Sequence, residues 1–380
     1  MGITSSPRRS GRPGAGGPLP SPSLVPSSRL VLATVAVDVP RGAQTYEGEI
    51  AARAQDALRA AAPGLHDPWT VERTVVRGLR STLAGTARLP LGYLTRASPR
   101  SRAMAGLSLY PHDAVVHRTD LRLPPAPHRE VLTIHDVAPW QFPDEGAPVR
   151  AATEEVRRAA AVICVSRYTA HEVAELFGID EPHVVRHGVG QQFFDADRVP
   201  SAYVASLGVT GPYVLHAGGA SQRKNLAALA EAWPAIRSAR PDLGLVLTGQ
   251  GHPERTRLFA GMPGTLLAGR VPPASVPGLV AGALAVVVPS LHEGFGLPAL
   301  EAMAARTPVV AAATGALPEI VGDTGILVAP TARGLAEGVV FATSGDPAVD
   351  RMVVRARRRA RWFTWERSAL EHAKIWRSVR

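Results

Sequence analysis

The sequence predicts an α/β protein with two Rossmann-like αβα domains that face each other across a cleft. Its 380 residues suit two domains of ordinary size, each able to bury most of its apolar surface. Short apolar runs bounded by turn residues recur in two successive series, with helical segments between them. That pattern is typical of central parallel strands covered on both faces by crossover helices. Because ligands of such sheets bind at the carboxyl ends of the strands, we expect the functional residues to follow the strands directly.

The first domain is expected at residues 29–198, after a tail. Residues 1–28 consist mainly of Gly, Pro, Ser and Arg, and we expect them to be disordered because this composition buries little apolar surface. An apolar run at 29–39 predicts the first strand, and an alanine-rich stretch at 46–62 predicts the helix after it. The other strands of this domain are predicted at 131–137, 160–166 and 183–189, and its further helices at 151–160 and 167–177.

The second domain is expected at residues 199–362. A stretch near residues 195–210 shows no strong periodicity, which indicates the linker between the domains. The strands of the second domain are predicted at 212–219, 243–251, 265–271, 283–290 and 307–313. No internal repeat of fixed period occurs, which excludes solenoids and propellers.

The charge balance is basic, with 42 Lys+Arg against 32 Asp+Glu and a net charge of +10. Such a balance favours anionic partners, such as phosphates or acidic lipid headgroups. No aromatic-interleaved basic stripe and no zinc-finger spacing accompanies the charge, so we expect no nucleic-acid partner. Most of the charge is interpreted as an arginine-rich surface that keeps the protein soluble.

Cysteine usage and hydropathy point to the cytoplasm. Cys164 is the only cysteine, which excludes an intrachain disulfide and a cysteine-based structural metal site. The N-terminal arginines are followed by Gly, Pro and Ser in place of the apolar stretch of a secretory signal. No run of about 18 apolar residues occurs, so a membrane-spanning helix is not expected.

The most informative segment directly follows a predicted strand, at residues 290–303, and reads SLHEGFGLPALEAM. Gly294 and Gly296 allow the backbone to turn tightly and to approach a ligand without a Cβ in the way, and Pro298 suits the first turn of a helix. At such a helix N-terminus the helix dipole and the unpaired amides favour a phosphate. The amides concerned belong to Phe295, Gly296 and Leu297.

A second segment, residues 216–233, reads HAGGASQRKNLAALAEAW and follows the first strand of the second series. Gly218 and Gly219 open a loop. Arg223 and Lys224 then stand at the predicted start of a helix, where cations oppose the helix dipole unless an anion lies nearby. A diphosphate would supply that anion, and the two cations would neutralise it as it leaves.

These segments carry a resemblance to a known family. Glu293 and Glu301, separated by seven residues that include Gly-Phe-Gly-Leu-Pro, resemble the signature of the retaining glycosyltransferases of family four, which have the GT-B fold. In that family the first glutamate contacts the donor sugar and the second hydrogen-bonds the ribose, and the resemblance implies these roles here. The Arg223-Lys224-Asn225-Leu226 segment resembles the mannosyl- and rhamnosyltransferase-like members, although the arginine that many relatives carry in the glycine loop is replaced by Gly219.

Three weaker matches complete the resemblance. The predicted strand at 131–137 ends in His135 and Asp136, and the resemblance implies that His135 faces the cleft near the donor sugar and the acceptor hydroxyl. Val271, in a Gly-Arg-Val segment, falls where relatives contact the nucleobase through backbone atoms. The segment at 363–380 resembles the terminal helix that crosses back onto the first domain. The segment at 41–49 lacks the double glycine of relatives, so its contacts cannot be assigned.

The resemblance implies transfer of a sugar from a nucleoside-diphosphate donor to a hydroxyl of a glycan or glycolipid, with retention of configuration. GDP-mannose is the first candidate donor. No cofactor and no metal is expected, because no Asp-x-Asp is placed to hold Mg²⁺ against a diphosphate and Arg223 and Lys224 would stabilise the charge. A lipid-linked acceptor would add peripheral contact with the inner face of the membrane.

Two alternatives stay open at this point. One is a nucleotide-sugar epimerase of the same architecture, which would form product without an acceptor. The other is a non-enzymatic protein that binds membrane surfaces through an arginine cluster near the C-terminus. The arginines of that cluster are Arg351, Arg355, Arg357, Arg358, Arg359 and Arg361.

Overall fold

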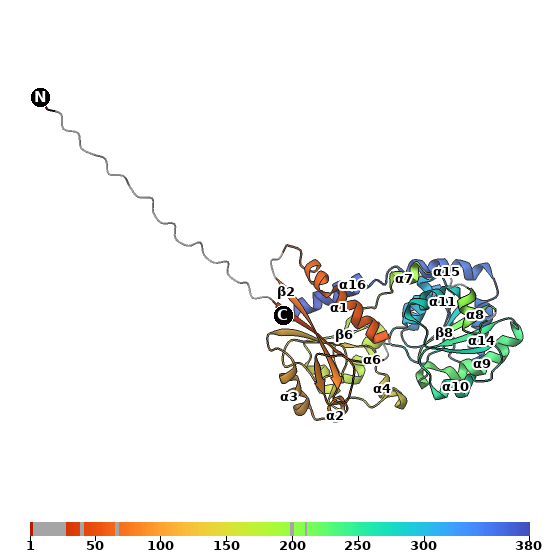
Figure 1. Ribbon diagram of the computed structural model, residues 1–380, viewed down its shortest axis with the longest axis horizontal. Coiled ribbons are helices and arrows are strands. Elements are labelled where there is room, and N and C mark those ends of the chain that lie inside the picture. The colour runs from red at the N-terminus through yellow and green to blue at the C-terminus, as the bar shows by residue number, and fades with distance from the viewer. Residues whose placement is uncertain (3–27, 39–41, 65–67, 198–200, 210) are drawn as a thin grey trace.

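The computed structural model describes residues 1–2, 28–38, 42–64, 68–197, 201–209 and 211–380. The predicted tail at 1–28 lies outside the described residues, apart from residues 1–2 and Ser28, and Ser28 already begins the first strand. Two parallel sheets organise the chain into two lobes, which stand side by side in Figure 1. The predicted two-domain α/β architecture of the GT-B type is thus confirmed.

The first lobe has a seven-stranded sheet of strand order β3-β2-β1-β4-β5-β6-β7, in which every pairing is parallel. The strands are β1 (Ser28–Val35), β2 (Trp69–Gly78), β3 (Ala87–Leu89), β4 (Ala114–Arg118), β5 (Glu130–Ile134), β6 (Ala161–Cys164) and β7 (His183–Val184). The helices are α1 (Gly42–Ala60), α2 (Leu91–Arg96), α3 (Pro99–Leu109), α4 (Ala138–Gln141), the 3₁₀ turn η1 (Pro143–Glu145), α5 (Ala152–Arg158) and α6 (Arg167–Phe177).

The second lobe has a six-stranded parallel sheet of order β10-β9-β8-β11-β12-β13. Its strands are β8 (Tyr213–Ala217), β9 (Gly244–Thr248), β10 (Thr265–Gly269), β11 (Ala285–Val288), β12 (Val309–Ala312) and β13 (Ile326–Val328). Its helices are α9 (Leu226–Ala239), α10 (Pro253–Phe259), α11 (Val276–Gly282), α12 (Leu297–Ala304), α13 (Leu317–Val321), α14 (Ala332–Ala342) and α15 (Pro347–Ala360), with the 3₁₀ turns η2 (Gln222–Lys224), η3 (Pro273–Ser275) and η4 (Gly322–Thr324). Two short helices, α7 (Gln191–Phe194) and α8 (Ser201–Ser206), precede β8.

Both sheets are buried on both faces, which is why their strands read as continuous apolar runs. In β8, Leu215 packs into the core below α11 and α12, whereas Val214 packs into the core below α9 and α14. In β1, Leu32 packs toward α1 and Val31 packs into the core on the opposite face. The successive side chains of each strand therefore fill two separate cores.

Several elements differ from the sequence-based expectation. Four strands, β2, β3, β4 and β13, were not predicted: β2 carries charged residues along its length, β4 ends in His117 and Arg118, and β3 and β13 have only three residues each. The segment at 41–49, whose contacts the sequence left unassigned, is from Gly42 onward the first part of α1. The expected strand at 183–189 is a strand only at His183–Val184, followed by one more hydrogen bond from the amide of Val185 to the carbonyl of Cys164.

The last helix, α16 (Trp365–Ser378), lies against α1 of the first lobe, as Figure 1 shows. A buried chain of hydrogen bonds joins it to the sheet. Trp376 Nε1 donates to Nδ1 of His117 (3.3 Å), and His117 Nε2 contacts the hydroxyl of Thr133 (2.7 Å). That hydroxyl lies 3.0 Å from Tyr46 Oη, which lies 2.7 Å from Nε2 of His372. The indole N–H of Trp376 can only donate. When all groups of this series are neutral, each N–H or O–H therefore donates to the next group, in the direction of His372.

Candidate active site

The loop after β11 holds the carboxylate of Glu293 in a fixed position. Ser290 Oγ donates a 2.7 Å hydrogen bond to Oε1 of Glu293, and the hydroxyl of Thr314 donates to the carbonyl of Ser290. The backbone carbonyl of Glu293 accepts from the amide of Ala316 (2.9 Å). The Glu293 side chain is only 9% exposed. The loop therefore presents a carboxylate whose orientation is set before any ligand arrives.

Two cations contact that carboxylate. Lys224 Nζ lies 2.6 Å from Oε1 of Glu293, and Arg223 Nη1 lies 3.2 Å from Oε2. Burial alone would raise the pKa of Glu293, but Lys224 and Arg223 lower it to about 2. Glu293 is therefore ionised at neutral pH. The structure brings together the three charged residues that the sequence placed after two different strands.

The cations lie on a short turn and not in an α-helix. Arg223 and Lys224 belong to η2, and Asn225, with a φ of 53°, separates this turn from α9. The side-chain amide of Asn225 donates to the carbonyls of Pro289 and Pro330, and the amide of Leu291 donates to the carbonyl of Arg223 (2.7 Å). The expected conflict between these cations and a helix dipole is thus avoided. The η2 turn is instead tied directly to the loop that carries Glu293.

The two glycines after Glu293 serve different purposes. Gly296 has a φ of 99°, which a tight turn before α12 requires. Gly294 has no such angle, but a Cβ at this position would lie 1.9 Å from the carbonyl oxygen of His135. The hydroxyls of Ser166 and Thr169 donate to the carbonyl of Gly294 (2.7 and 3.1 Å). Gly294 therefore allows the first lobe to approach, a role that the sequence did not predict for it.

Phe295 and Leu297 flank Gly296 at the beginning of α12. Phe295 is buried, and its ring contacts His187 of the first lobe at a centroid distance of 4.7 Å. Leu297 is half-buried and lies next to the core shared by α1 and α16. The turn that was predicted to face a phosphate therefore also forms part of the contact between the lobes.

Glu301 lies further along α12, apart from the Glu293 cluster. Its side chain is half-buried, and no ion pair joins it to a cation within the described part of the chain. Burial without such a partner raises the pKa of Glu301 to about 8. The two glutamates of the motif thus have opposite electrostatic environments, one strongly ionised and one close to its titration point at neutral pH.

His135 follows β5 and lies at the boundary between the lobes. Its ring is 4.8 Å from that of Tyr46 and 5.5 Å from that of His187, measured between centroids. Burial lowers the pKa of His135, so the imidazole is neutral. Within the described residues its Nε2 is buried without a hydrogen-bond partner. No ring contact or hydrogen bond links His135 to Arg223 or Lys224 among the described residues. The neighbouring Asp136 does interact electrostatically with Arg223.

The glycine loop after β8 is supported by an arginine that sequence reasoning missed. The guanidinium of the buried Arg255, on α10, donates to the carbonyls of Gly218 and Gln250. The next residue, Gly219, faces open space. Burial lowers the pKa of Arg255, with no carboxylate among the causes. Val271 follows β10 and is half-buried against the core of the second lobe. The signal in the sequence for Arg255 was its position in the first turn of the helix that follows a predicted strand.

Three acidic residues of the first lobe reach the second lobe and were also missed. Asp144 and Glu145, in η1, contact η2: Asp144 Oδ2 accepts from the amide of Gln222 (2.7 Å), and Glu145 Oε1 lies 2.5 Å from Arg223 Nε. Glu172 of α6 lies 2.9 Å from Nε2 of His292. The detectable signal was an acidic turn, Pro-Asp-Glu-Gly, shortly after the carboxyl end of a predicted strand.

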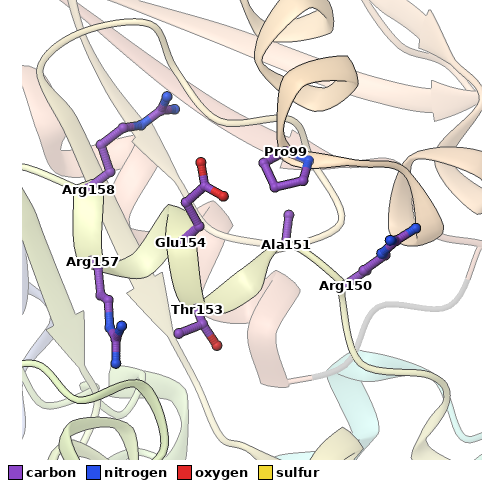
Figure 2. Close-up of a pocket in the computed structure, with 7 residues that line it drawn as sticks. All are labelled: Pro99, Arg150, Ala151, Thr153, Glu154, Arg157 and Arg158. Carbon is purple, nitrogen blue, oxygen red and sulfur yellow. The ribbon is translucent and has the colours of Figure 1, made fainter.

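Two cavities lie outside this cluster. One, of about 640 Å³, lies on the first lobe beside α5, and Figure 2 shows that Arg150, Arg157 and Arg158 around it point in different directions. The other, of about 820 Å³, lies where the chain passes between the lobes and includes His187, Glu319 and Trp362. Neither cavity includes Glu293, Arg223 or Lys224.

Comparison with known proteins identifies relatives of this chain. A family model described as glycosyl transferases group 1 matches residues 211–343. O-antigen chain mannosyltransferase B of Escherichia coli is 28% identical over 275 residues, which cover 67% of this chain and 71% of the relative. Alpha-maltose-1-phosphate synthase of Mycolicibacterium smegmatis is 30% identical over 289 residues, or 67% of this chain and 73% of the relative.

A third relative and two solved structures are also similar to this chain. A GDP-mannose-dependent alpha-(1-6)-phosphatidylinositol dimannoside mannosyltransferase of Mycobacterium tuberculosis is 33% identical over 214 residues, or 55% of each chain. Sucrose-phosphate synthase of Thermosynechococcus elongatus has a TM-score of 0.68 at 21% identity, covering 93% of this chain and 99% of that chain. HepE of Anabaena, in complex with UDP and glucose, has a TM-score of 0.69 at 20% identity, covering 92% and 99%. At these identities the structural likeness concerns the fold.

Proposed function

The chain belongs to the group 1 glycosyl transferases, and on this premise we propose that it transfers a sugar from a nucleoside-diphosphate donor to an acceptor hydroxyl, with retention of anomeric configuration. The observation that carries the proposal is the contact of Lys224 and Arg223 with Glu293 at the carboxyl ends of the neighbouring strands β8 and β11. Fixed cations beside a fixed carboxylate suit a donor that joins a polyol sugar to a diphosphate.

In the proposed mechanism Arg223 and Lys224 neutralise the diphosphate as the glycosidic bond breaks. Charge that develops on a leaving phosphate is stabilised best by donors already in place, because no reorganisation is then needed. Glu293 is ionised, and Ser290 and Lys224 orient it, so it accepts hydrogen bonds from the sugar hydroxyls. Glu301 holds the ribose, and the neutral His135 lies near the acceptor hydroxyl. We propose that the two cations serve in place of a metal ion.

GDP-mannose is the donor we propose first. The Arg-Lys-Asn-Leu segment favours it, and so do the names of two relatives, a mannosyltransferase of Escherichia coli and a GDP-mannose-dependent mannosyltransferase of Mycobacterium tuberculosis. UDP-glucose is the second candidate, because the solved HepE structures include a complex with that donor. The nucleobase would lie near Val271, at the end of β10.

For the acceptor we propose a hydroxyl of a glycan or lipid-linked glycan at the inner face of the membrane. None of the helices in the described part of the chain combines the length and apolar composition needed to cross a bilayer. Helix α15 and the residues after it present an exposed stripe instead, in which Trp362 is 69% and Val354 is 71% exposed. Its arginines are Arg351, Arg355, Arg358 and Arg361. A basic face with an exposed tryptophan suits anionic headgroups.

The structure narrows the arginine cluster that the sequence suggested for such contact. Arg357 donates to the carbonyls of Ala304 and Phe194, and Arg359 donates to those of Ile320 and Glu319. These two arginines tie α15 to the second lobe and do not belong to the exposed stripe. Flotation with vesicles that contain anionic lipids, at low and high salt, measures what the remaining four contribute.

The test of the proposed function is a transfer assay with purified protein, GDP-mannose or UDP-glucose, and candidate glycan acceptors. We expect release of the nucleoside diphosphate only with a matching acceptor, an α-linked product from an α-linked donor by NMR, and unchanged rates in EDTA. Conversion of the donor sugar without any acceptor would favour an epimerase. Lack of turnover and of nucleotide binding across the donor panel would contradict the proposal.

A further inference from the structure

The cations of the donor site are occupied by an acidic turn of the opposite lobe. Glu145 Oε1 lies 2.5 Å from Arg223 Nε, and both side chains are 16% exposed. The preceding residue, Asp144, accepts from the amide of Gln222, at the start of the same η2 turn (2.7 Å). Two adjacent carboxylates of η1 therefore contact the turn that carries Arg223 and Lys224. One binds a side chain of that turn, and the other binds a backbone amide.

The carboxylates that act on Arg223 outnumber the two cations, Arg223 and Lys224, that are proposed to bind the diphosphate. Arg223 and Lys224 supply two positive charges, whereas Glu293, Glu145 and Asp136 supply three negative charges that act on Arg223. Burial would raise the pKa of Glu145, but Arg223 lowers it below its usual range, so Glu145 is ionised at neutral pH. A bound diphosphate would add like charge beside these carboxylates. Displacement of one carboxylate would remove this repulsion.

Glu145 is the carboxylate that is free to leave. Glu293 belongs to the same lobe as the cations and is held by Ser290 and Lys224. Glu145 instead ends a three-residue turn, and Gly146 after it has a φ of 96° with no atom near its missing Cβ. Its contact with Arg223 joins residues 78 positions apart in different lobes. Displacing it breaks neither of the hydrogen bonds by which Ser290 and Lys224 hold Glu293.

We propose that the Asp144–Glu145 turn is an internal competitor of the donor diphosphate. The inference rests on the proposed function. The carboxylates of the Asp144–Glu145 turn take the place that the phosphates take in the donor complex, and the donor binds by displacing them. The turn thereby sets the affinity for the donor and selects for ligands with enough negative charge to replace two carboxylates. When the carboxylates of the turn are removed, the affinity for a nucleoside monophosphate increases less than the affinity for a nucleoside diphosphate.

The test compares nucleotide affinity in the full-length wild type, Glu145→Gln and the double variant with Asp144→Asn. Isothermal titration with GDP and GMP, and with UDP and UMP, gives the dissociation constants. We expect Glu145→Gln to bind the preferred nucleoside diphosphate about tenfold more tightly and the corresponding monophosphate less than threefold more tightly. The matched control is Glu154→Gln, which removes the same charge from an exposed site on α5, beside the cavity of Figure 2. We expect less than a twofold change in this control.

The outcomes separate this inference from the function on which it rests. Unchanged or weaker diphosphate binding in Glu145→Gln, with normal binding in the wild type, would overturn the inference alone, since Glu145 would then orient Arg223 for the ligand. Equal gains for diphosphate and monophosphate would also overturn it, because general loosening of the lobes would explain them. If neither wild type nor variant binds any nucleotide, the proposed function fails as well.

Discussion

Nζ of Lys224 lies 2.6 Å from Oε1 of Glu293, although the two residues are 69 positions apart in the chain. Each follows a strand, β8 and β11, and these strands are neighbours in the second sheet. The carboxyl ends of neighbouring parallel strands open on the same edge, so their loops meet there. The pair therefore results from sheet topology and not from any local sequence relation.

Removing either charge of this pair is expected to abolish transfer while the fold remains. Lys224→Ala and Glu293→Gln each delete a group that would contact the donor, and the loss of one preorganised charge typically lowers turnover about 10²- to 10³-fold. Steady-state kinetics and circular dichroism measure the two effects. Lys374→Ala, the only other lysine, lies exposed on α16 and serves as the control. Turnover near the wild-type rate in either site variant would refute the assignment.

Adding one methyl group at Gly294 is expected to disturb the contact between the lobes. The new Cβ would lie 1.9 Å from the carbonyl oxygen of His135, so the two backbones must separate. Overpacking of this kind costs about 1–3 kcal/mol, and we expect Gly294→Ala to lose most of its activity. Gly251→Ala is the control, because nothing lies within 4 Å of its missing Cβ and its φ is not positive. Thermal unfolding and transfer rates, compared between the two variants, decide the matter.

Arg255 is expected to contribute to donor affinity although it does not contact the proposed Glu293 site directly. Its guanidinium holds the carbonyl of Gly218, and a charged hydrogen bond of this kind contributes about 1.5–3 kcal/mol. We expect Arg255→Met to raise the donor KM about tenfold and to change kcat little. Arg257→Met, on the exposed side of the same helix, should leave both constants unchanged. A fall in kcat alone would show that Arg255 acts on a later step.

Donor binding is expected to depend on pH through Glu301. Its pKa of about 8 in the folded protein means that the carboxyl is largely protonated at pH 7. If the carboxylate accepts the ribose hydroxyls, nucleotide affinity should rise as pH increases through about 8 and should level off above it. Titrations at pH 6.5, 7.5, 8.5 and 9.5 test this. Glu301→Gln should bind with the same affinity across the range, and a pH dependence that persists in this variant would exclude Glu301 as its source.

Acid is expected to destabilise the first lobe well above the usual titration range of carboxylates. Burial lowers the pKa of His117 far below 6.5 and that of His372 to about 4. A depressed histidine pKa means that the unfolded chain takes up protons first, so stability is complete above pH 6.5 and falls as pH decreases toward 4. His372 alone should account for about 3 kcal/mol by pH 4. Urea unfolding at several pH values measures the slope, and a curve that stays flat down to pH 5 would contradict the prediction.

Much of the second lobe could be predicted from local sequence, and the first lobe less so. All five strands predicted after residue 210 occur in the structure, because buried parallel strands read as short apolar runs. Strand β2 escaped prediction because charged residues interrupt it, and β4 escaped because its apolar run of three residues is followed by His117 and Arg118. Periodicity is a weak signal where strands are short or carry charge.

The sequence by itself determined the α/β class, the glycine turn after β11 and the placement of Arg223, Lys224 and Glu293 at strand ends. These features follow from local chemistry: apolar runs, turn residues and the rule that parallel strands open their loops on one edge. Only the tertiary structure decided that Glu145 lies on Arg223, that Gly294 makes room for His135 and that Tyr46 lies in a hydrogen-bonded chain with α16. Each of these contacts joins residues from distant segments, and it depends on how whole elements pack, which no spacing within one segment encodes.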